Sequence, residues 1–99
     1  MKKDKSAEQK PKGIKKTFVI NNKLGLHARP AALFVQTANQ FNADVEVRKS
    51  REKVNGKSIM GIMTLAAEAG SIIHVTITGA DAPEAMAALE KLISSDFGE

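Results

Sequence analysis

Cysteine, tryptophan and tyrosine are absent from this 99-residue sequence, and only four phenylalanines represent the aromatic residues. Without cysteine, disulfides, thiolate catalysis and cysteine-ligated metal sites are excluded, and the sequence indicates neither a metal nor a cofactor. No run of eighteen apolar residues occurs, so we expect no membrane insertion. So few aromatic side chains give little support to stacking on nucleic-acid bases.

Positive charge is concentrated at the N-terminus. Residues 1–16 carry seven lysines against two acidic residues, whereas residues 17–99 carry eight basic and nine acidic residues. A nucleic-acid-binding domain places its positive charge on the folded surface, so this distribution argues against nucleic acid as a partner. Residues 1–13 are predicted to be a disordered basic tail that solubilises the protein, with weak contact to an acidic partner or a membrane surface as the alternative.

We expect residues 14–99 to form one domain in the cytoplasm, because no secretory h-region is present. Hydrophobic periodicity predicts strands at 14–20, 44–49, 52–54 and 72–78, and helices at 28–38, 59–64 and 82–95. Ser58 is the candidate N-cap of the second helix, and residues 81–84 (DAPE) form a candidate capping box for the third. Because the two middle strands form a hairpin, the sequence predicts an α+β sandwich with an antiparallel sheet and its helices on one face.

His27 is the strongest candidate for chemistry, because it immediately precedes the first predicted helix. The unpaired N–H groups and the positive dipole end of a helix form an anion site, which would suit a phosphoryl group bonded to the imidazole. Arg29 adds a guanidinium that matches phosphate oxygens, and Gly25 permits close approach of the backbone. No phosphate-binding loop for a nucleotide is present, so the site is predicted to carry a phosphoryl group rather than to act as a kinase.

These residues alone leave simpler interpretations open. A histidine before a helix is more often only a capping residue, and a lone Arg29 is more often a solvated surface charge. Ser58 by itself is most simply a structural cap. His74 lies within a predicted strand on the face opposite the apolar residues, with no partner at ligand spacing, so we assign it no function.

Two segments favour the phosphocarrier interpretation over these simpler ones. Residues 24–32 (LGLHARPAA) and 54–63 (VNGKSIMGIM) resemble two motifs of the HPr family, the histidine-containing phosphocarriers of the bacterial phosphoenolpyruvate:sugar phosphotransferase system. The similarity extends over residues 14–99 to the ending Phe97-Gly98-Glu99. It implies an open-faced sandwich in which a four-stranded antiparallel sheet of order 1-4-2-3 lies under three helices.

The resemblance also assigns residue roles. His27 matches the histidine that accepts a phosphoryl group at Nδ1 from enzyme I and donates it to enzyme IIA domains. Arg29 matches the arginine that stabilises the phosphate, with Gly25, Ala28 and Pro30 forming the phosphate-contacting loop and helix start. Ser58 matches the serine modified by an HPr kinase/phosphorylase. The last assignment is a surface on which partner proteins dock, formed by Leu26, Ile59, Met60 and Met63. We expect a phosphate on Ser58 to weaken the binding of partners to this surface.

The sequence departs from the sugar-pathway pattern at Leu24, where many members have a small polar residue. Residues 22–25 (NKLG) resemble the nitrogen-related branch of the family, whereas the Ser58 segment resembles the kinase-regulated members. The alternative to a sugar phosphocarrier is therefore a nitrogen-related phosphorelay, or a regulatory homologue that acts mainly by docking. Transcriptional regulators are then a further class of partner, and we expect the chain to be a monomer.

Overall fold

The computed structural model of the protein describes residues 13–99, so the predicted tail lies outside the described residues except for Gly13. All seven predicted elements are present, and their ends differ from the prediction by one residue at most. A short 3-10 turn after the last helix was not predicted. The elements are β1 (Ile14–Val19), α2 (Ala28–Ala38), β2 (Asp44–Lys49), β3 (Glu52–Asn55), α3 (Ile59–Thr64), β4 (Ile72–Thr78), α4 (Ala82–Ser94) and η1 (Asp96–Gly98).

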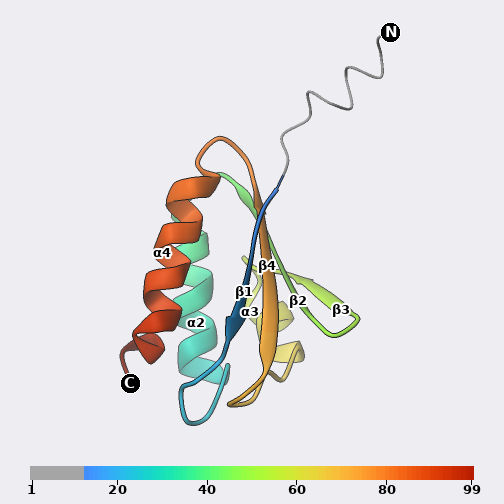
Figure 1. The fold of residues 1–99 in the computed structure, drawn as a ribbon, viewed down its shortest axis with the longest axis vertical. Helices are drawn as coiled ribbons and strands as arrows, with labels where there is room; N and C mark the ends of the chain where they lie inside the picture. The colour runs from blue at the N-terminus through green and yellow to red at the C-terminus, as the bar shows by residue number, and fades with distance from the viewer. Residues whose placement is uncertain (1–12) are drawn as a thin grey trace, which may run out of the picture.

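The four strands form one antiparallel sheet in the order β1-β4-β2-β3. Helices α2 and α4 lie side by side along the sheet, and α3 is shorter and follows β3 (Figure 1). The opposite face of the sheet has no covering element within residues 13–99. This architecture confirms the predicted α+β open-faced sandwich.

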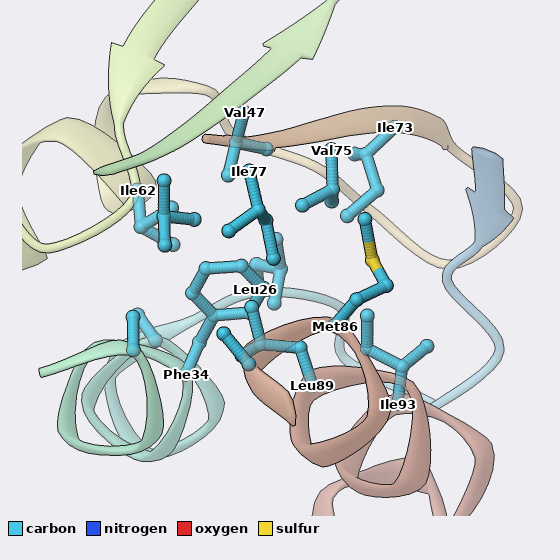
Figure 2. Close-up of a cluster of buried hydrophobic side chains, with 14 of the residues drawn as sticks. Leu26, Phe34, Val47, Ile62, Ile73, Val75, Ile77, Met86, Leu89 and Ile93 are labelled. Atoms are coloured by element: carbon cyan, nitrogen blue, oxygen red, sulfur yellow. The ribbon is translucent and has the colours of Figure 1, made fainter. Parts of the chain in front are cut away.

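Strand alternation builds the core. Inward residues of β2 and β4 are fully buried, and they face the apolar sides of α2 and α4 (Figure 2). Burying an aliphatic or aromatic side chain of this size stabilises the fold by about 1.5–3 kcal/mol. The central contacts are made by Val47, Ile73, Val75 and Ile77 from the sheet, and by Phe34, Ile62, Leu89 and Ile93 from the helices.

Asp81 does not form the predicted capping box. Its backbone (φ −100°, ψ 23°) is not extended as an N-cap requires, and its side chain makes no capping hydrogen bond. Its carboxylate instead accepts the backbone N–H groups of Asn42 at 2.9 Å and Ala43 at 2.8 Å. The hydrogen bond from Asn42 is the main reason that the pKa of Asp81 is lowered, although burial acts in the opposite direction. The carboxylate therefore ties the start of α4 to the loop before β2.

His74 lies on the outer face of the sheet, where its Nδ1 is 3.0 Å from Oγ1 of Thr17 on the neighbouring strand. No helix within residues 13–99 has the length and apolar character needed to cross a membrane.

Candidate functional site

His27 occupies the N-cap position of α2, in extended backbone conformation (φ −86°, ψ −163°). Its side chain forms no capping hydrogen bond and is 39% exposed. The N–H groups of Ala28 and Arg29 form no hydrogen bond with the described residues, and Pro30 has no N–H to offer. The helix therefore begins with two free donors beside a half-exposed imidazole, which is the arrangement that an anion site needs.

The two nitrogens of the His27 ring have different surroundings. Nε2 is buried and lies 3.4 Å from Oε2 of Glu99, too long for a good hydrogen bond. Nδ1 makes no hydrogen bond with the described residues and is not among their enclosed, unpaired atoms. Nδ1 is consequently the nitrogen that an incoming group can reach.

Gly25 fixes the loop that leads to His27. Its φ is +73°, and a Cβ at this position would stand 2.3 Å from the carbonyl oxygen of Ala67. That same oxygen accepts the N–H of Leu26 at 2.8 Å, so the loop is fastened to the segment before β4. Any other residue at position 25 would push this contact apart.

Leu26 corrects the predicted docking surface. It is 3% exposed and belongs to the hydrophobic core, so it offers no surface to a partner. Figure 2 shows its side chain among those of the core. The N–H of His27 donates to the carbonyl oxygen of Gly25 at 2.9 Å, so the chain turns tightly at Leu26, whose side chain is buried while that of His27 stays partly exposed.

Two residues that the sequence did not single out complete the site. Asn22 is 3% exposed, and its Nδ2 donates to the carbonyl oxygen of Gly25 at 2.8 Å and to Oε1 of Glu99 at 3.3 Å. Glu99 thereby reaches both Asn22 and the ring of His27. No local signal marks this pair, because 77 positions separate the two residues.

The end of the chain is folded against the site. Phe97 is buried, and its carbonyl oxygen accepts a hydrogen bond from Nη1 of Arg29 at 3.4 Å. Asp96, Phe97 and Gly98 all have positive φ, which turns the chain back toward His27. A cavity of about 400 Å³ lies beside the ring, lined by residues 21–24 and by His27, Asp96 and Glu99.

Ser58 is the N-cap of α3, as predicted, because its Oγ accepts the N–H of Gly61 at 3.0 Å. The helix that follows exposes apolar side chains: Met60 is 72% exposed, Met63 41% and Ile59 40%. We call these three residues of α3 the apolar patch; a further exposed apolar side chain, Leu24 (67% exposed), lines the cavity beside His27. Single exposed apolar residues are ordinary, but a group of this kind is typical of a docking surface.

No group of acidic or histidine side chains within residues 13–99 could hold a metal ion. The arrangement around His27 consists of a partly exposed imidazole, two amides without partners among the described residues and the guanidinium of Arg29, with the exposed Leu24 beside the ring.

Comparison with known proteins agrees with this site. A family model described as "PTS HPr component phosphorylation site" matches residues 14–95. The chain belongs to the HPr family. These proteins are phosphocarriers of the phosphotransferase system, so the resemblance seen in the sequence is confirmed at the level of the family.

Individual relatives cover nearly the whole domain. The phosphocarrier protein HPr of Neisseria meningitidis serogroup A is 54% identical over 86 residues, which are 87% of this chain and 97% of that protein. A crystal structure of HPr from Thermoanaerobacter tengcongensis is similar with a TM-score of 0.85 and 52% identity, over 87% of this chain and 97% of the other. A dimer of HPr from the same organism is also similar (TM-score 0.71, 54% identity, coverage 83% and 94%). The expected monomer therefore stays a prediction.

Proposed function

We propose that this chain carries a phosphoryl group on Nδ1 of His27, which it receives from phosphorylated enzyme I and donates to enzyme IIA domains. The lone pair of Nδ1 forms the new bond to phosphorus, while the bond between phosphorus and its donor residue on enzyme I breaks and leaves its electrons there. The same exchange with an acceptor residue regenerates His27. The accessible Nδ1 beside two free helix amides is the observation that supports this function.

The surrounding residues stabilise the phosphoryl oxygens. The amides of Ala28 and Arg29 point out of the first turn, where the helix dipole adds positive potential. Arg29 is tied to Phe97 by only one long hydrogen bond, so its guanidinium can turn to the phosphate. Glu99 carries negative charge next to the ring and opposes the phosphoryl group, which keeps the phosphorylated form ready to transfer.

The direct test is labelling with enzyme I and radioactive phosphoenolpyruvate. We expect an acid-labile adduct that is absent from His27→Ala. His74→Ala is the matched control, because it removes the other histidine, which lies on the outer face of the sheet, and should be labelled normally. Label that survives in His27→Ala, or that resists acid, would contradict the proposal.

Ser58 is proposed as the site at which an HPr kinase/phosphorylase regulates docking. Its Oγ stands at the start of α3, directly before the apolar patch residues Ile59 and Met60. A phosphate there adds about two negative charges next to apolar side chains that a partner must cover. Ser58→Asp should therefore slow phosphoryl transfer from enzyme I, and Ala87→Asp on the exposed side of α4 should not. Equal rates for the two variants would reject the regulatory role.

We propose that the carrier works in the cytoplasm. We also propose that it works as a monomer, because one chain supplies every group of the site. The downstream partner is an enzyme IIA domain, and Leu24 bears on which one. Its exposed side chain adds apolar surface beside His27, which favours an acceptor that is apolar where it meets this residue. The likeness of residues 22–25 to the nitrogen-related branch suggests an acceptor of that branch. Comparing Leu24→Thr with the wild type on sugar-specific and nitrogen-related IIA domains decides between the branches. If neither accepts the phosphoryl group, docking to transcriptional regulators becomes the better explanation.

A further inference from the structure

Asn22 is a buried polar residue to which the proposed function gives no task. Its side chain is 3% exposed and lies in the loop between β1 and α2. Nδ2 donates to the carbonyl oxygen of Gly25 at 2.8 Å and to Oε1 of Glu99 at 3.3 Å, whereas Oδ1 has no hydrogen-bond partner within residues 13–99. Burying an amide that is only partly hydrogen-bonded costs stability, so its presence here points to a function other than packing.

The neighbours of Asn22 determine which way its amide points. A carbonyl oxygen and a carboxylate oxygen both accept hydrogen bonds, so the NH2 end of the amide has to face them. The bond to Gly25 is local and short. The bond to Glu99 joins residues 77 positions apart, and no other hydrogen bond within the described residues holds that carboxylate. Asn22 therefore restrains the side chain of Glu99 as well as the loop.

The second carboxylate oxygen of Glu99 faces the ring of His27. Oε2 is 3.4 Å from Nε2, the enclosed ring nitrogen, and a shift of about 0.4 Å would turn this contact into a hydrogen bond. A neutral imidazole carries a hydrogen on one nitrogen and a lone pair on the other. Beside an oxygen that can only accept, a lone pair on Nε2 is repelled and an N–H is attracted. The carboxylate therefore favours the tautomer with its hydrogen on Nε2 and its lone pair on Nδ1.

We propose that Asn22 is a positioning residue, which sets the tautomer of His27 through the carboxylate of Glu99. By holding Oε1, Asn22 keeps Oε2 against Nε2, and the ring presents an unprotonated Nδ1 to the phosphoryl donor. Without the carboxylate, water can solvate the accessible Nδ1 in either tautomer, and the selection is lost. The inference rests on the proposed function, because the tautomer matters for transfer only if Nδ1 forms the bond to phosphorus.

A purely structural role is the alternative for Asn22, because its shorter hydrogen bond serves the loop at Gly25. The two roles differ in their dependence on Glu99. If Asn22 only supports the loop, removing its side chain changes the ring of His27 to the same extent with and without the carboxylate. If Asn22 acts through Glu99, removing it has no further effect once the carboxylate is gone.

The test measures the tautomers of His27 in the unphosphorylated protein, by the nitrogen-15 chemical shifts of its ring at about pH 8.5, where a histidine is ordinarily neutral. The variants are Asn22→Ala, Glu99→Ala and the double variant. Asn21→Ala is the matched control, because Asn21 is exposed, lines the same cavity and makes no side-chain hydrogen bond with the described residues. His74, on the outer face of the sheet, gives a reference signal in every spectrum. Transfer rates are a less direct measure, because the charge of Glu99 also acts on the phosphoryl group.

We expect the hydrogen of wild-type His27 to lie mainly on Nε2. Asn22→Ala and Glu99→Ala should each lower the ratio of the Nε2–H tautomer to the Nδ1–H tautomer by about fivefold, the effect of losing one hydrogen bond. The double variant should give the same ratio as Glu99→Ala. Asn21→Ala should leave the ratio unchanged, and the signals of His74 should be the same in all proteins.

Thermal unfolding checks that each variant is folded. If Asn22→Ala unfolds, Asn22→Ser replaces it with the same expected ratio, because its single hydroxyl hydrogen is satisfied by the nearer carbonyl oxygen of Gly25. Three results would overturn the inference: a wild-type His27 with its hydrogen on Nδ1, an unchanged ratio in the Asn22 variant, or an equal effect of that variant with and without Glu99. A wild type that has the expected tautomer but takes no label from enzyme I would instead contradict the proposed function alone.

Discussion

Helices α2 and α3 begin in the same way in the sequence, with a polar residue before an apolar segment, but they end up with opposite properties. At α3 the side chain of Ser58 accepts the N–H of Gly61, so the helix start is closed by its own cap. At α2 the side chain of His27 leaves the amides of Ala28 and Arg29 without partners in residues 13–99. Closing a helix start stabilises the helix, whereas leaving it open preserves a binding site for an anion.

The start of α4 shows a third outcome. Asp81 has the residue type of a good cap, yet its carboxylate serves the loop at Asn42 and Ala43. The residue type at a helix start therefore does not decide its use. What decides it is which backbone donors lie within reach of the side chain once the fold is complete.

The largest effect is expected from making α2 resemble α3 through His27→Ser. The backbone is already extended at this position, so a serine hydroxyl can accept an N–H of the first turn. We predict complete loss of phosphoryl transfer together with a gain of about 0.5–2 kcal/mol in the free energy of unfolding relative to His27→Ala. Urea unfolding and the labelling assay measure the two effects. If His27→Ser and His27→Ala are equally stable, the amides of α2 are not available.

The next effect concerns the loop that presents the open helix start. Gly25→Ala combines a positive φ with a clash against the carbonyl oxygen of Ala67, and it should cost about 2–4 kcal/mol of unfolding free energy. Gly70→Ala is the matched control, because its φ is also positive (+92°) but nothing lies within 4 Å of the added Cβ. It should cost only about 1 kcal/mol. Equal losses would mean that the close approach at Gly25 is unimportant.

Removing the closed cap should have a smaller effect. Ser58→Ala deletes the acceptor for Gly61 and should lower the free energy of unfolding by about 1 kcal/mol, while transfer from enzyme I stays near the wild-type rate. Ser94→Ala, at the exposed end of α4, has no such hydrogen bond to lose and serves as the control. A large loss of transfer in Ser58→Ala would show that the serine itself takes part in docking.

The smallest effect is a dependence of stability on pH at the third helix start. Because hydrogen bonds from Asn42 and Ala43 lower the pKa of Asp81, its ionised form stabilises the native state at neutral pH. That contribution to stability is lost as the pH falls through the lowered pKa of Asp81 in the folded protein. Wild type should therefore be more stable than Asp81→Asn at pH 7, and the difference should shrink in acid. A series of thermal melts of the two proteins from neutral to acid pH measures this difference.

The comparison also shows what the sequence could predict. The elements follow from local periodicity, and the cap at Ser58 involves a donor only three residues away. Asp81 was assigned wrongly because its partners lie 38 and 39 positions away, where a local motif carries no information. The contact between Asn22 and Glu99 could not be predicted for the same reason, because it too joins residues that are far apart in the sequence. Leu26 adjoins His27 in the sequence but is buried, because the turn between Gly25 and His27 that separates the two side chains depends on contacts with the distant Ala67.

The left-handed turn formed by Asp96, Phe97 and Gly98 has a practical consequence for anyone who fuses another polypeptide to this domain. Buried Phe97 anchors the turn, so whatever follows Glu99 emerges next to the imidazole of His27. A purification tag placed there would compete with partners for access to the carrier's reactive end. Strand β1 starts at the opposite end of the molecule (Figure 1), which makes the N-terminal side the safer place for a fusion.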